Sequence, residues 1–153
     1  MNAKAAQQHV FSTMLTKQWE QINEKITTLA ERFPEEKYDF SPADGTRTFG
    51  GVLRHLAFWN RFVADTARGI KTDETSNELS IREYPTKAQV VDALKRSAAE
   101  ATAAFKAHNA EMEPKTAELC MTFTQHSSEH YGQLVVYYRL NGIVPPAPRT
   151  EGQ

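Results

Sequence analysis

The sequence predicts an all-α four-helix bundle, and three observations support this fold class. Apolar residues recur at steps of three or four along four segments of roughly 20 to 27 residues each. Prolines, glycines and capping residues separate these segments, and no stretch alternates apolar and polar residues as a strand would. A chain of 153 residues with 40% apolar content has the size of one domain, so we expect a single domain over 1–153 with a loose tail at 147–153.

The first predicted helix runs from roughly His9 to Phe33. Proline 34 ends it, because proline cannot donate the backbone hydrogen bond that would continue the helix. The segment 35–47 contains Ser-Pro and Asp-Gly steps and is predicted to be a loop. The residues of the expected packed stripe, at helical spacing, are Phe11, Leu15, Gln18, Ile22, Ile26, Leu29 and Phe33.

The second predicted helix carries an inward-facing histidine. Thr48 stands where an N-cap is expected, and the helix continues to about Arg68 before Gly69 ends it. The residues that share a face with His55 are Gly51, Val52, Phe58, Trp59 and Phe62. We expect the three aromatic residues to fill the core rather than to line a substrate site. Taken alone, His55 is better explained as a core residue with a hydrogen bond to a backbone carbonyl than as a metal ligand.

Residues 70–85 form a long polar connection between the second and third helices. Leu79, Ile81 and Tyr84 are the residues able to fix its second half against the bundle. A connection of this length either crosses an end of the bundle or covers a cleft, and the sequence leaves both open.

The third and fourth helices are bounded by clear signals. Thr86 and Gln89 match a capping box at the start of the third helix. Its apolar face comprises Val90, Leu94, Ala98, Ala101 and Phe105. The fourth helix is predicted over about 114–140, and the Asn-Gly step at 141–142 gives it a stop of the left-handed type.

The fourth helix contains a pair of histidines, His126 and His130. Positions i and i+4 lie on one face of a helix, so both imidazoles enter one volume, as in a pair that holds a metal ion. The face that they share consists otherwise of Leu119, Phe123, Gln133, Leu134 and Tyr137. The spacing alone also arises by chance, but two imidazoles on an apolar face need partners for their nitrogens. A metal ion with a third ligand would supply them, and His55 on another helix is the candidate.

Four other residues of the fourth helix differ in where they lie relative to this face. Gln133 and Tyr137 lie on it, and are equally explained as contacts to the ligands or substrate and as polar core residues. Glu129 points about 80° away and is expected to flank the site. Cys120 is expected to be a buried thiol rather than a fourth ligand. Arg139 is expected to cap the helix dipole, with binding of an acidic thiol cofactor as the alternative.

Composition excludes several classes of function. With 18 basic and 19 acidic side chains, a formal charge of −1 and no Lys/Arg-rich run, the chain lacks the electrostatic footprint of a nucleic-acid-binding protein. Its single cysteine cannot form an internal disulfide, and the N-terminal residues lack the apolar core of a signal peptide. No apolar run approaches the length of a membrane span. We therefore expect a soluble, cytoplasmic protein without membrane contacts.

Three motifs resemble the DinB-like (DinB/YfiT) superfamily of small four-helix proteins. Residues 48–57 resemble its second-helix motif with an inward histidine, and residues 126–134 resemble its fourth-helix His-x-x-x-His followed by Gly-Gln. Residues 138–146 resemble the chain end of one branch of the superfamily. The resemblance implies a four-helix fold over most of the chain.

The resemblance also implies a metal site and an activity. It makes His55, His126 and His130 the three ligands of a divalent ion, usually nickel or zinc, with water in the remaining positions. Three protein ligands leave a position for water or substrate, as in catalytic sites. Relatives are implied to be thiol-dependent transferases and isomerases in detoxification or stress response, using mycothiol, bacillithiol or glutathione. A hydrolase that uses metal-bound hydroxide and a non-enzymatic metal- or ligand-binding bundle are the alternatives, and a homodimer is implied as well.

Overall fold

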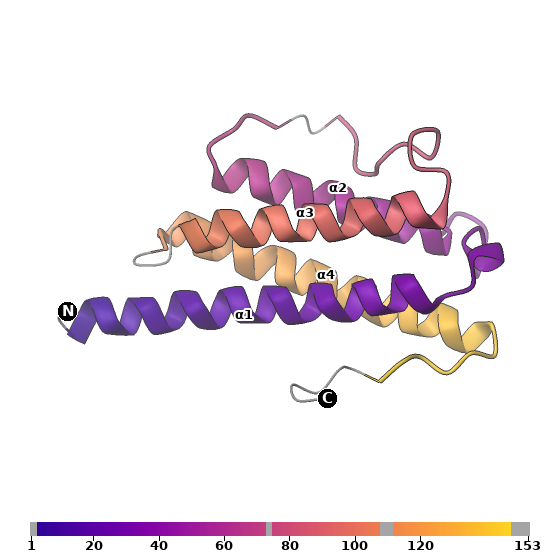
Figure 1. Ribbon diagram of the computed structural model, residues 1–153, viewed down its shortest axis with the longest axis horizontal. Coiled ribbons are helices and arrows are strands. Elements are labelled where there is room, and N and C mark those ends of the chain that lie inside the picture. The colour runs from indigo at the N-terminus through magenta and orange to yellow at the C-terminus, as the bar shows by residue number, and fades with distance from the viewer. Residues whose placement is uncertain (1–2, 73–74, 108–111, 148–153) are drawn as a thin grey trace.

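The computed structural model is an all-helical bundle, as the sequence predicts (Figure 1). It describes residues 3–72, 75–107 and 112–147. The helices are α1 (Ala3–Arg32), α2 (Phe49–Ala67), α3 (Lys87–Ala107) and α4 (Pro114–Leu140), with a short 3-10 helix, η1 (Glu35–Lys37), in the first loop. This part of the chain contains no strand. It also contains no helix long and apolar enough to cross a membrane.

The helix ends follow the capping signals in the sequence. The Thr48 hydroxyl accepts a hydrogen bond from the first turn of α2 at 3.0 Å. At the start of α3, the Gln89 side chain accepts from the Thr86 amide at 3.2 Å, and the Thr86 hydroxyl accepts from the Gln89 amide at 3.3 Å. Gly69 and Gly142 follow α2 and α4 at φ values of +73° and +71°, a region that strains other residues.

Helix α1 differs from its prediction at its N-terminal end. It begins at Ala3 rather than near His9, because the preceding alanine, lysine and glutamine residues are strong helix formers. Two residues of the expected stripe, Phe11 and Gln18, are exposed. Trp19 is fully buried instead and packs edge-on against Phe105 of α3.

Each helix packs against two neighbours, in the order α1, α3, α2, α4 around the bundle. Helices α2 and α3 lie side by side and run in the same direction (Figure 1). The chain must therefore return along the length of α2 before α3 can begin, which explains the long connection over 68–86. Helices α2 and α4 run in opposite directions, so the middle of α2 faces the middle of α4.

The second half of the connection is held to the bundle by two of the three expected residues. Leu79 is buried, and the Tyr84 hydroxyl accepts a hydrogen bond from Arg61 of α2 at 2.8 Å. Ile81 is 54% exposed, so its expected packing was wrong. It lies in a turn that carries its side chain away from the helices.

The core consists of two apolar clusters at opposite ends of the bundle. The larger cluster contains Phe33, Phe49 and Tyr138, and the smaller one contains Trp19 and Phe105. Between them lies a buried polar contact, in which the Asn60 side chain of α2 donates to Asn23 of α1 at 3.1 Å. On α4, His126 and His130 lie in sequence between the residues that build the two clusters, whereas His55 lies within the part of α2 that builds the larger cluster.

Candidate metal centre

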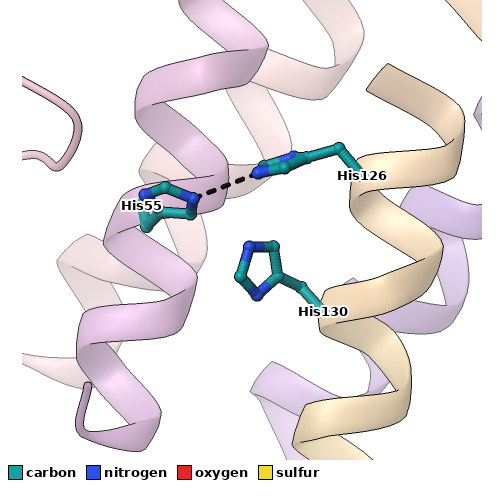
Figure 2. Close-up of side chains that lie close together, drawn as sticks. All are labelled: His55, His126 and His130. Atoms are coloured by element: carbon teal, nitrogen blue, oxygen red, sulfur yellow. Dashed lines mark hydrogen bonds between the residues drawn. The ribbon is translucent and has the colours of Figure 1, made fainter. Parts of the chain in front are cut away.

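Three histidines from two helices converge between α2 and α4 (Figure 2). One ring nitrogen each of His55, His126 and His130 lies within 4.8 Å of the other two. The Nε2 atoms of His55 and His126 are 3.1 Å apart. The helical spacing of His126 and His130 places both rings on the side of α4 that faces His55. The structure thus brings together the three histidines that the sequence singled out.

The proton of His55 is placed by the connection that follows α2. His55 Nδ1 lies 2.5 Å from the backbone carbonyl of Asn77. A carbonyl oxygen only accepts hydrogen bonds, so Nδ1 carries the proton and donates it. The Nε2 atom, which points toward the other two histidines, therefore keeps its lone pair.

The proton of His130 is placed by a chain of three hydrogen bonds. The Tyr137 hydroxyl donates to the backbone carbonyl of Arg47 at 2.7 Å, and the Gln133 amide nitrogen donates to that hydroxyl at 2.9 Å. The Gln133 carbonyl oxygen is left to accept from His130 Nδ1 at 2.8 Å. Because the chain ends on a carbonyl, its direction is fixed, and His130 also keeps the lone pair on Nε2.

His126 lacks such a support. Its Nδ1 atom is buried and has no hydrogen-bond partner within the described residues. Without an ion, the short contact between the Nε2 atoms of His55 and His126 requires His126 to donate, which leaves the lone pair of its Nδ1 buried and unpaired. A bound metal ion would instead use the Nε2 lone pairs of His55 and His126, which would remove the need for His126 to donate to His55.

Burial keeps two of the three imidazoles neutral. It lowers the pKa of His55 and of His126 from 6.5 to about 4, since charging a ring in this apolar region is unfavourable. Both rings are therefore neutral at neutral pH, with one ring nitrogen that keeps its lone pair, and this is the form that binds metals. Three converging imidazoles, two of them with fixed tautomers, fit a divalent transition-metal ion such as zinc or nickel.

Comparison with known proteins agrees with this arrangement. The family model described as the DinB superfamily matches residues 18–137, which include all three histidines. The chain belongs to the DinB superfamily. A comparison with curated proteins gave no match.

The buried histidines of this DinB protein make its stability depend on pH. Their folded-state pKa lies below the unfolded value of 6.5, so the unfolded chain binds more protons between pH 6.5 and 4. The free energy of unfolding of metal-free protein should therefore decrease as the pH falls through this window. Urea unfolding at several pH values measures it, and we expect the dependence to be weaker in His126→Gln. Equal dependence in the wild type and in His126→Gln would contradict a lowered pKa at His126.

An aromatic surface adjoins the three histidines on one side. The ring of Trp59 packs against Phe62 and Phe123, with centroids 5.1 and 5.6 Å away, and against His126 at 6.4 Å. Phe62 and Phe123 pack on the smaller core cluster, but Trp59 is a member of neither cluster. All three rings are partly exposed. The expectation of a core role holds for Phe58, which packs on the larger cluster, and for Phe62. It fails for Trp59, which borders the three histidines instead.

The remaining candidates lie where the helix geometry placed them. Glu129 is exposed and accepts a hydrogen bond from Gln125 at 3.4 Å, away from the ligand group. Cys120 is fully buried, and burial raises the pKa of its thiol to about 11. Its sulfur lies 3.6 Å from the Leu15 carbonyl oxygen and outside the ligand group. Neither residue is a ligand in this arrangement.

Sequence reasoning missed the residues that support His55. Asn77 and Glu78 belong to the polar connection, and Arg47 belongs to the loop before α2. The sequence feature that could have pointed to these residues is charge, because the glutamate of the connection and the arginines near the start of α2 have opposite charges and attract each other. That signal does not say which carbonyl reaches the histidine.

Proposed function

We propose that this DinB protein is a metal-dependent enzyme that joins a low-molecular-weight thiol to an electrophilic small molecule. His55, His126 and His130 would hold one zinc or nickel ion. The observation that carries the proposal is the convergence of three imidazole nitrogens, all within 4.8 Å of one another, in a group that no fourth His, Cys, Asp or Glu joins among residues 3–72, 75–107 and 112–147. Structural zinc sites usually have four protein ligands, whereas catalytic sites have three and an open position.

The proposed reaction converts a thiol R–SH and an electrophile R′–X into R–S–R′ and HX. When bound, a divalent ion lowers the pKa of a coordinated thiol or water and so supplies the nucleophile. The aromatic surface of Trp59, Phe62 and Phe123 would bind the apolar part of the electrophile beside the three histidines. The family membership supports the metal site. Four further statements are predictions: the transferase reaction, its small-molecule substrate, its role in detoxification or stress response, and the implied homodimer.

Thiol consumption tests the reaction type. Protein loaded with zinc or nickel would be mixed with glutathione, bacillithiol or mycothiol and with an aromatic electrophile such as an aryl halide. We expect thiol loss that requires the metal and is absent in His126→Ala. Loss of an ester substrate without loss of thiol would favour the hydrolase instead. Stoichiometric metal binding without either reaction would favour a binding protein.

Gln133 and Tyr137 are proposed to orient His130 for the metal. Replacing Gln133 with leucine removes the acceptor of the His130 Nδ1 proton and should lower the affinity for zinc by about 10- to 100-fold. Competition with a chromogenic chelator measures the affinity. Gln125→Leu, on an exposed face of the same helix, is the matched control and should bind zinc like the wild type. Equal affinities of the two variants would show that the hydrogen-bond chain does not support the site.

A further inference from the structure

Arg47 contacts the supports of two different histidines. Its backbone carbonyl ends the hydrogen-bond chain from His130 by accepting from Tyr137 at 2.7 Å. Its guanidinium donates to the side-chain oxygen of Asn77 at 3.1 Å and to the carboxylate of Glu78, also at 3.1 Å. Asn77 is the residue whose carbonyl accepts from His55. A single loop residue before α2 is thus connected to a ligand on α2 and to a ligand on α4.

Residues 77–79, which we name the strap, are held against α2 by a second arginine. Arg54 directly precedes His55, and its side chain is only 6% exposed. Its Nε atom donates to Glu78 Oε1 at 3.3 Å, so one carboxylate bridges Arg47 and Arg54. A buried guanidinium needs such a partner, because its charge has little access to water. The Leu79 amide donates to the Arg54 carbonyl at 3.4 Å, and the Leu79 side chain is buried.

Gly51 lies beside both the strap and the cap of α2. A Cβ atom at position 51 would lie 3.1 Å from the capping hydroxyl of Thr48, which is a tight contact, and 3.4 Å from Glu78 Oε1 and from Arg47 Cβ, which is ordinary contact. Glu78 and Arg47 thus pack directly against the first turn of α2.

We propose that Glu78 and the Arg47 side chain are positioning residues of the metal centre. They hold the strap so that the Asn77 carbonyl keeps the His55 proton on Nδ1 and leaves Nε2 free for an ion. The hydrogen-bond chain from His130 ends on the backbone carbonyl of Arg47 and does not involve the Arg47 side chain. Side-chain changes at position 47 should therefore affect His55 and leave His130 unchanged. The consequence for metal affinity rests on the proposed function, whereas the tautomer of His55 is a property of the metal-free protein.

The test uses the full chain with the variants Glu78→Gln and Arg47→Gln. Glu83→Gln is the matched control, since Glu83 is an exposed glutamate of the same connection. Nitrogen-15 NMR of the metal-free protein reports which ring nitrogen of each histidine is protonated. We expect Nδ1–H at His55 in the wild type and in Glu83→Gln, a mixture of tautomers in the two test variants, and an unchanged His130 in all four proteins. Hydrogen exchange at the Leu79 amide should become faster in Glu78→Gln, and zinc affinity should fall by about 10- to 100-fold in both test variants.

Each other outcome decides the matter. If Leu79 exchanges faster but the His55 tautomer is unchanged, the strap does not position the ring, and the proposal is overturned. Unchanged Leu79 exchange overturns it as well, because Glu78 would then not hold the strap. If the His55 tautomer shifts in the two test variants as expected, but the wild-type protein binds neither zinc nor nickel, the positioning role is supported and the proposed metal function fails. Should Glu78→Gln not fold, Arg47→Gln answers the same question, since it keeps the carboxylate partner of the buried Arg54.

Discussion

Replacing any one of His55, His126 or His130 with alanine should lower the affinity for zinc or nickel by more than about 100-fold. This loss is larger than the one expected for residues that only hydrogen-bond to these histidines. Each replacement removes one of three converging nitrogens and leaves a site with two. Helix content should stay close to that of the wild type, because burial of apolar side chains stabilises the bundle. Elemental analysis after dialysis and competition with a chelator measure the loss, and circular dichroism checks the fold.

The control for this series is His9→Ala, an exposed histidine on α1 far in sequence from the site. It should bind one ion per chain like the wild type. Metal occupancy that is unchanged in all three ligand variants would refute the assignment of the site. Occupancy lost in the His126 and His130 variants but kept in the His55 variant would reduce the site to the helical pair and remove the contribution of α2.

Replacing Phe33 with alanine should destabilise the protein by about 3–5 kcal/mol, with or without metal. Phe33 is fully buried at the end of α1, and its ring stacks on Phe49 with centroids 3.8 Å apart and packs on Tyr138 at 4.8 Å. Removing the ring leaves a cavity among residues of three helices, which cannot all move to fill it. Chemical denaturation of metal-free and zinc-loaded protein measures the change.

The matched control is Phe11→Ala, the same substitution at a position of α1 where the ring is 50% exposed. We expect it to change the free energy of unfolding by less than about 1 kcal/mol. A small effect of Phe33→Ala together with a large effect of metal removal would show that the ion, rather than the apolar core, determines the stability of the bundle. That result would contradict the division of roles between core and metal centre.

The sequence predicted most of the helices and part of the site. Local signals predicted the caps at Thr48 and Thr86 and the glycine after α4, because each depends only on residues within four positions of a helix end. The structure confirms all three. The prediction missed Trp19 because the expected stripe, drawn through Phe11, contained Gln18 instead. The buried face of α1 is rotated from that stripe toward Trp19. Near the N-terminal end of α1, helical spacing predicts an apolar face that includes Phe11, but Phe11 is half exposed because no other helix among the described residues covers it.

The sequence by itself determined the four helices and the shared face of His126 and His130, because both depend on interactions within a few residues. Only the tertiary structure decided that His55 meets this pair across 71 residues of chain and that Asn77 holds its proton across 22. The parallel arrangement of α2 and α3 sends the connection back along α2 (Figure 1), and Asn77 of this connection lies within hydrogen-bond distance of His55. Periodicity carries no information about such a path, since packing between whole helices sets it.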